Sequence, residues 1–259
     1  MARVGAVLRV TVRTVGELLI TFSVLTALFI VYQLYYTNLV GRQVMDDEVN
    51  AMHKQWTAAQ RLLPVAPSPP GDPAPAVSST SATPSPDHPA APAQKGASAP
   101  VVQAPPATLR GGDAVAILHI PRLGTGAADS GTPVLEGIGL DVLNKATGHY
   151  PGTALPGQLG NFAVAGHRKT HGEPFRHLDE LRAGDLVYVE TATAWYTYRI
   201  DADPVIVQPS DVGVVDAVPG QPGAVPSRSL ITLTTCNPWW SSTQRMIVTG
   251  HLVSAKPRT

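Results

Sequence analysis

The sequence contains a single cysteine, Cys236, at the end of the apolar and β-branched run TLTTC. A cysteine attacks a carbonyl carbon as its thiolate, and at an ordinary pKa of about 8.5 little of the thiol is ionised at neutral pH. A nucleophilic cysteine therefore needs an imidazole nearby to accept its proton. It also needs a cation or hydrogen-bond donor to stabilise the oxyanion of the tetrahedral intermediate.

Two other strand-like segments could supply these groups. The run NFAVAGH ends at His167, and Arg245 begins the run RMIVTGHLV nine positions after Cys236. If the strands flanking the loop CNPWWSSTQ are neighbours, Arg245 begins its strand beside the end of the cysteine strand. The spacing thus predicts a thiol, an imidazole and a guanidinium at one rim of a β-domain. The residues alone do not favour His167 over four other histidines: His149, His171, His177 and His251.

These residues also have structural interpretations. A lone cysteine is often a small buried hydrophobe, and an isolated arginine is often a surface charge. Thr234 and Thr235 could hydrogen-bond a substrate or simply pack within their strand. His167 and His171 are four apart, which is a metal-ligand spacing on a helix but loses that meaning in a loop. Together with the lack of an acidic cluster among Asp113, Asp129 and Glu136, this predicts no metal and no cofactor.

Charge and composition narrow the function classes. The 259 residues carry 19 basic and 19 acidic side chains, so the formal net charge is zero. Nucleic-acid binding normally requires a basic face, and we therefore expect no nucleic-acid partner.

The N-terminal segment predicts a membrane anchor. Residues 15–37 form the candidate helix, and the 19 positions of 18–36 contain no charged residue. At 1.5 Å per residue they span about 28 Å, which is close to the thickness of the hydrocarbon layer. Three arginines precede the segment, so the positive-inside rule places residues 1–14 in the cytoplasm and the later domain outside the cell. The alternative, a cleaved signal peptide, would have a shorter apolar region and a small-residue cleavage site.

Two segments separate the anchor from the strand-rich region. Residues 38–63 predict a juxtamembrane helix with a heptad spacing of apolar positions: Val49, Met52, Trp56, Ala59 and Leu63. This face could dimerise, lie on the membrane or pack on the domain. Residues 64–108 are rich in proline, alanine and serine, and they predict a disordered linker that could carry the domain away from the membrane.

Residues 109–256 form the expected folded domain. Short β-branched or aromatic runs separated by Gly, Pro and Asp predict strands at 114–121, 161–167, 185–191, 195–200, 204–209, 229–235 and 245–253. Helices are predicted at 139–150 and 173–181. Many closely spaced strands with few helices favour a mainly β fold, either a closed barrel or a sandwich.

Three separated motifs make this region resemble the sortases, which are membrane-anchored cysteine transpeptidases of Gram-positive bacteria. The run TLTTC matches the family's TLxTC cysteine motif at Cys236. The AGHR run matches its catalytic histidine at His167, and Arg245 matches its arginine. The segment GHYPGTALPGQLGNFAVAGHR, the PFRHLDEL run and the TCNP run are similar to class E sortases, which are typical of actinobacteria.

The resemblance implies a closed barrel of about eight strands and a specific reaction. The Cys236 thiolate would attack the Thr–Gly bond of an LAxTG- or LPxTG-type sorting signal, with Arg245 on the oxyanion or the peptide and His167 transferring protons. A thioester would then pass to an amine of a peptidoglycan precursor of the lipid II type. The implied partners are exported proteins with C-terminal sorting signals, the wall precursor and the membrane.

Three alternatives remain open from the sequence. A cysteine peptidase would pass the acyl group to water, and a pilin-type transpeptidase would pass it to a lysine. The latter often carries an Asp-Pro-aromatic lid motif, which does not precede Ala114. An anchored, non-catalytic wall-binding β-domain would keep the strands without needing Cys236.

Overall fold

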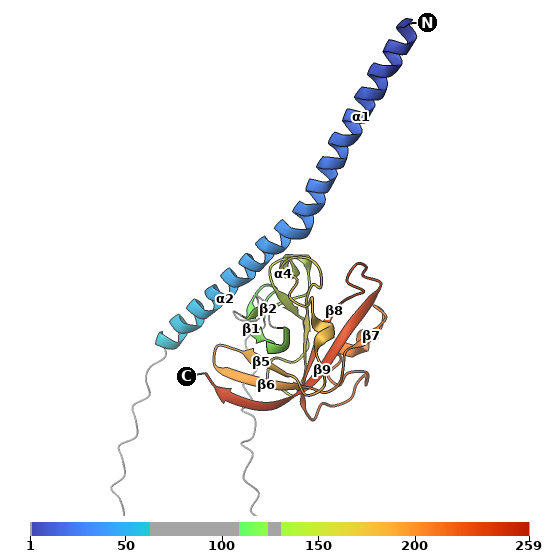
Figure 1. Cartoon of the computed structure of the whole chain (residues 1–259). Helices are drawn as coiled ribbons and strands as arrows, with labels where there is room; N and C mark the ends of the chain where they lie inside the picture. The colour runs from blue at the N-terminus through green and yellow to red at the C-terminus, as the bar shows by residue number, and fades with distance from the viewer. Residues whose placement is uncertain (1, 63–108, 124–130, 259) are drawn as a thin grey trace, which may run out of the picture.

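The computed structural model describes residues 2–62, 109–123 and 131–258. The N-terminal part is helical throughout: α1 spans Ala2–Val31, a π-helical turn spans Tyr32–Tyr36, and α2 spans Thr37–Leu62. Within α1, Thr11–Val31 is long and apolar enough to cross a membrane. The helix axis bends between α1 and α2 (Figure 1), at the kind of position where a π turn kinks a helix. The linker predicted at 64–108 lies outside the described residues.

The remainder is a closed β-barrel. Its strands are β1 Ala114–His119, β2 Thr132–Glu136, β3 Thr147–His149, β4 Gly160–Ala165, β5 Leu186–Glu190, β6 Ala194–Ile200, β7 Val205–Val207, β8 Ser229–Asn237 and β9 Gln244–Pro257. Eight of them follow the order β6-β5-β1-β2-β3-β4-β8-β9, and pairing of β9 with β6 closes the barrel. The expected closed barrel of about eight strands is thus confirmed.

The long strand β9 closes the barrel because it pairs with two different strands of the barrel. Its first part pairs antiparallel with β8, and its second part pairs antiparallel with β6. The short strand β7 attaches to the other edge of the first part of β9. The two parallel pairings, β2 with β3 and β4 with β8, connect strands that are not joined by hairpins.

The barrel interior is apolar and follows the alternation of strand side chains. Phe162 and Val164 of β4 and Ile231 and Leu233 of β8 are fully buried in its main core. The intervening positions of β4 and β8 therefore point to the outer face.

Two helices predicted from the sequence differ from the structure, and two strands, β2 and β3, were not predicted. The helix predicted at 139–150 is helical only over α4, Leu140–Leu143, and its later residues form β3. The helix predicted at 173–181 is reduced to the 3₁₀ turn Leu178–Glu180. Strand β2, which was not predicted, contains a proline. In both segments tertiary packing outweighs the local helix propensity. Val142 packs in the second apolar cluster, and Phe175 and Leu178 pack in the barrel core, without a regular helix of the predicted length.

Helix α2 packs along the barrel (Figure 1). Val49, Met52 and Trp56, the first three positions of the heptad pattern, are buried in a second apolar cluster with Ile117 and Leu135. The protein's own barrel therefore covers these three positions of the predicted face, whereas Ala59 is exposed and Leu63 lies outside the described residues. The packing of α2 thus attaches the barrel to the helix that continues α1.

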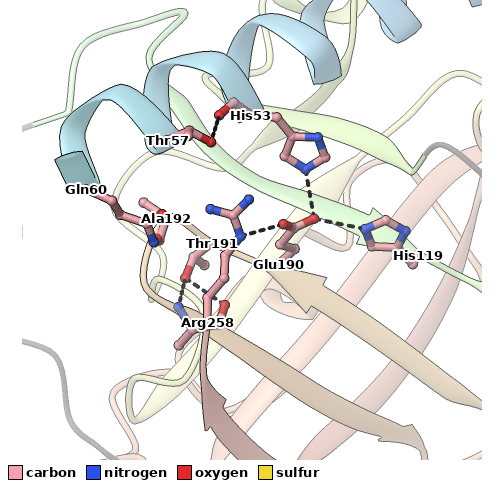
Figure 2. Close-up of polar contacts among 9 residues, drawn as sticks. His53, Thr57, Gln60, His119, Glu190, Thr191, Ala192 and Arg258 are labelled. Carbon is pink, nitrogen blue, oxygen red and sulfur yellow. Dashed lines mark hydrogen bonds and ion pairs between the residues drawn. The ribbon is translucent and has the colours of Figure 1, made fainter.

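A buried carboxylate joins α2 to both ends of the domain. Glu190 contacts Nε2 of His53 on α2 at 3.0 Å and Nε2 of His119 on β1 at 3.4 Å. Arg258, near the C-terminus, donates from Nε to the same carboxylate at 2.7 Å (Figure 2). The guanidinium of Arg258 also lies over the ring of Trp56, 5.3 Å from its centroid. Burial alone would raise the pKa of Glu190, but the two histidines and Arg258 outweigh it and lower the pKa to about 2.

This cluster predicts a pH dependence of stability. Above pH 4.5 the Glu190 carboxylate is ionised in both the folded and the unfolded chain, so its stabilisation is complete. As pH falls from 4.5 towards 2, the unfolded chain binds the proton first, and the stabilisation is lost. In thermal melts of the full chain, Glu190→Gln should lower the melting temperature at neutral pH, and the difference from wild type should shrink below pH 4.5. The exposed Glu180→Gln should show no such difference, and a Glu190→Gln difference that is constant down to pH 3 would contradict the assignment.

Candidate active site

The parallel pairing of β4 with β8 brings the end of the histidine strand to the end of the cysteine strand. Ala165 is the register partner of Thr234, and the N–H of Gly166 donates to the Thr234 carbonyl at 3.0 Å. The hydroxyl of Thr235 in turn donates to the Gly166 carbonyl at 2.7 Å. His167 and Cys236 each follow the Ala165–Thr234 pair by two residues, so both lie just beyond the last pair of this ladder.

The antiparallel pairing of β8 with β9 adds the arginine. Cys236 and Arg245 are direct register partners, so their side chains share a face of the sheet. That face is the outer one, because the alternate residues Leu233 and Met246 belong to the barrel core. Cys236 and Arg245 are each partly exposed. Cys236 on β8 and Arg245 on β9 are therefore paired on the outer face, and His167 follows the end of β4 by two residues at the same end of the sheet.

The ring of His167 is held by stacking. It lies against the ring of His171, with centroids 5.0 Å apart and planes 28° apart. Its Nε2 is buried and has no hydrogen-bond partner among the described residues. Burial and the neighbouring His171 lower the pKa of His167, so the neutral imidazole predominates at neutral pH. A nitrogen that no protein group occupies is suited to proton transfer.

The loop after His167 has an unusual backbone. His171 and Glu173 have φ values of 54° and 56°, and Gly172 between them has a φ of 82°. These left-handed conformations are rare for residues with side chains. They let the chain turn back so that the N–H of Phe175 donates to the His167 carbonyl at 3.0 Å.

Arg168 fixes this loop to the cysteine strand, a role the sequence did not reveal. Its Nη1 donates to Oδ1 of Asn237, the residue after Cys236, at 2.6 Å. Its Nη2 lies 3.2 Å from Oδ2 of Asp179, and its side chain is only 7% exposed. The residues that follow the histidine and the cysteine are thus joined by a buried guanidinium, which restricts how His167 and Cys236 can move apart. The sequence signal for this contact was the position of Arg168 directly after His167 in the AGHR run.

Arg245 is oriented by its own hairpin. Its Nη1 donates to the carbonyls of Ser242 at 3.0 Å and Gln244 at 2.9 Å. Because one nitrogen serves both carbonyls, the remaining guanidinium donors keep their capacity for a substrate. Nδ2 of Asn237 donates to Oε1 of Gln244 at 3.0 Å and closes the base of the same hairpin.

The two threonines before Cys236 already have protein partners. The hydroxyl of Thr235 bonds to Gly166, and that of Thr234 lies 3.0 Å from the hydroxyl of Tyr150. Both residues are 3% exposed. A contact between either hydroxyl and a substrate stays a prediction.

The outer face of β4 and β8 is covered further from the catalytic end. Nδ2 of Asn161 donates to the carbonyls of Val214 at 3.3 Å and Asp216 at 3.1 Å, which attaches the 3₁₀ turn Val212–Val215 to β4. Thr232 on β8 is fully buried although it belongs to this outer face. The 3₁₀ turn Val212–Val215 therefore packs over the outer face of the sheet at the start of β4.

Comparisons with known proteins agree with this geometry. The sortase domain family matches residues 118–253. The chain is 33% identical over 254 residues to Sortase SrtE1 of Streptomyces coelicolor, covering 95% of this chain but 58% of that protein. It is 27% identical over 257 residues to Sortase SrtE2 of the same organism, covering 97% of this chain and 85% of that one.

Solved structures show the same relationship. Sortase E from Streptomyces avermitilis is 47% identical with a TM-score of 0.51, over 57% of this chain and 93% of its own. The SrtA sortase from Actinomyces oris is 37% identical with a TM-score of 0.55, over 60% of this chain and 88% of its own. The chain belongs to the sortase family, whose members are cysteine transpeptidases, and the predicted similarity to class E is confirmed.

The stacked histidines predict a measurable coupling. Because His171 lowers the pKa of His167, His171→Gln should raise it towards the ordinary value of about 6.5. The shift is measured by following the ring resonances of His167 by NMR as a function of pH. His251→Gln, a substitution on the distal half of β9, should leave the His167 midpoint unchanged. A lower or unaltered midpoint in His171→Gln would show that His171 does not act on His167 in this way.

Proposed function

We propose that this protein is a membrane-anchored sortase that cleaves a sorting signal at Cys236 and transfers the acyl group to an amine. The observation that supports this most strongly is the strand register, which pairs Cys236 with Arg245 and ends the β4–β8 ladder two residues before both His167 and Cys236. Family membership gives the reaction class. The geometry supports the role that we propose for each residue.

The chemistry begins with a proton transfer. The neutral imidazole of His167 accepts the thiol proton of Cys236, which leaves a thiolate and an imidazolium. The thiolate attacks the carbonyl carbon of the bond to be cleaved, and the negative charge that develops on its oxygen is stabilised by the free donors of Arg245. The C–N bond then breaks, the imidazolium protonates the leaving amine, and a thioester on Cys236 remains.

The second half reverses these roles. An incoming amine attacks the thioester carbonyl while neutral His167 accepts its proton, and the Cys236 thiolate leaves. A new amide bond forms, so the number of amide bonds is conserved. With water in place of the amine the product would be a free carboxylate, as in a peptidase.

We further propose the substrates and location implied by the family. The donor is an exported protein with an LAxTG- or LPxTG-type signal cut between Thr and Gly, and the acceptor is an amine of a peptidoglycan precursor. Helix segment Thr11–Val31 crosses the membrane once, with residues 1–14 in the cytoplasm and the barrel outside. Helix α2 holds the barrel next to the membrane, where exported proteins emerge.

Kinetics of the full chain in detergent test the catalytic roles. With fluorogenic LAxTG and LPxTG peptides, Cys236→Ala should abolish cleavage. His167→Ala should lower kcat/KM by roughly 100-fold or more, because it removes acid–base catalysis. Arg245→Ala should lower it by roughly 100- to 1,000-fold, because it removes an oxyanion donor.

Matched substitutions elsewhere on the barrel serve as controls. His251→Ala and Arg199→Ala change the same residue types at a distance from Cys236 and should keep wild-type kinetics. Addition of triglycine should convert the product from the free acid to the amide of the added amine. Full activity of Cys236→Ala would exclude cysteine catalysis and hence this function. Absence of cleavage by wild type would favour a non-catalytic domain, and an unchanged acid product would identify a peptidase.

A further inference from the structure

A cavity lies between the membrane-proximal helix and the loops that carry the catalytic residues. It has a volume of about 420 Å³ and is lined by Tyr35 from the π-helical turn, by Arg168, Lys169 and Arg176 from the histidine loop, and by Trp239. A second cavity of about 370 Å³ shares Tyr35 and Arg176 with it and extends to Arg42. Arg168 and Lys169 directly follow His167, and Trp239 is three residues beyond Cys236, so these cavities adjoin the active site.

The lining is cationic. Its charged side chains are four cations, Arg42, Arg168, Lys169 and Arg176, against the two carboxylates of Glu173 and Asp179. Glu173 is buried and is contacted by Arg176 and by Nδ2 of Asn38. Arg42 also lies 3.9 Å from Glu173, and Arg168 pairs with Asp179 at 3.2 Å. The four cations still outnumber the two carboxylates, so the lining keeps a surplus of positive charge.

Lys169 contributes most directly to this surplus. Its Nζ lies 5.1 Å from the centroid of the Trp239 ring. No carboxylate of the described residues forms an ion pair with it within 4 Å. An ammonium group held over an aromatic ring at the wall of an open cavity is well placed to bind an anion.

The position of the cavity relative to the membrane indicates the source of that anion. Tyr35 lies four residues after Val31, the end of the apolar segment, which is about 6 Å along the helix. The headgroup layer on each side of a bilayer is about 5–8 Å thick, so Tyr35 lies within it. Trp239 and Trp240 are exposed by 53% and 67%, as expected of tryptophans at a membrane interface.

We propose that this cavity binds the phosphate or diphosphate group of a lipid in the outer leaflet, with Lys169 and Arg176 as its principal ligands. The volume accommodates a headgroup, the charge is of the right sign, and the cavity opens at headgroup level. One consequence rests on the proposed function: a group carried by the bound lipid would be held beside the residues that follow His167 and Cys236. A lipid-linked amine would thereby be delivered to the thioester.

Binding can be measured without catalysis. The full chain in detergent micelles is titrated with phosphatidylglycerol, with farnesyl diphosphate and with zwitterionic phosphatidylcholine, and bound lipid is counted by native mass spectrometry. Wild type should bind one anionic lipid and discriminate against phosphatidylcholine. The double variant Lys169→Gln/Arg176→Gln should bind it roughly 10- to 30-fold more weakly, since each cation near an anionic surface contributes about one kcal/mol.

Charge-matched and conservative variants make the test specific. Arg199→Gln/Lys256→Gln removes two exposed cations from β6 and β9 and should bind as wild type does. Lys169→Arg should retain binding. If thermal melts show that the double variant does not fold, Lys169→Gln alone, which leaves the Glu173 contacts intact, should weaken binding about fivefold.

The results distinguish bulk phospholipid from a lipid-linked substrate, and they also show whether the proposed site exists. Tighter binding of phosphatidylglycerol would identify bulk phospholipid, and tighter binding of the diphosphate would identify a lipid-linked substrate. Equal binding by wild type and the double variant, equal loss in Arg199→Gln/Lys256→Gln, or equal binding of phosphatidylcholine would overturn the proposal. Because no turnover is required, this result is independent of whether Cys236 acts as a nucleophile.

Discussion

The backbone ladder that joins β4, β8 and β9 is the constraint on which the site depends. Hydrogen bonds between Gly166 and residues 234 and 235 extend the parallel pairing past the end of β4, and both His167 and Cys236 lie just beyond the last pair of the ladder. The antiparallel register then sets Arg245 opposite the cysteine. Side chains from positions far apart in the sequence are thus aligned by main-chain geometry, and a shift of one residue would turn each of them to the other face.

A second layer of contacts holds this alignment in place. The buried Arg168 guanidinium joins the histidine loop to Asn237 and Asp179. The left-handed residues 171–173 turn the chain so that Phe175 donates to the His167 carbonyl. Gly41 of α2 fits against this turn, where a Cβ would come within 2.4 Å of the backbone of His171 and Gly172. Helix α2 therefore forms part of the environment of the active-site loop as well as connecting the barrel to α1.

Much of this could be predicted from sequence, and the remainder could not for physical reasons. The sequence identifies three strands from the runs that end at His167 and Cys236 and the run that begins at Arg245. The AGHR motif then selects His167 among the five histidines considered as the catalytic base. Strand β3, only three residues long, carries too little periodic signal, and the proline of β2 obscures that strand. The role of Arg168 and the docking of α2 depend on long-range contacts, and a heptad pattern specifies an apolar face without specifying its partner.

The central claim is that Cys236 becomes covalently acylated at the end of this ladder. Intact-mass spectrometry of the full chain, incubated with a sorting-signal peptide and quenched in acid without added amine, tests it most directly. Acylation predicts a mass increase equal to the peptide acid that ends at threonine less one water, located on the fragment that contains Cys236 and removed by hydroxylamine. Cleaved peptide with no adduct on that fragment, or an adduct that persists in Cys236→Ala, would contradict it.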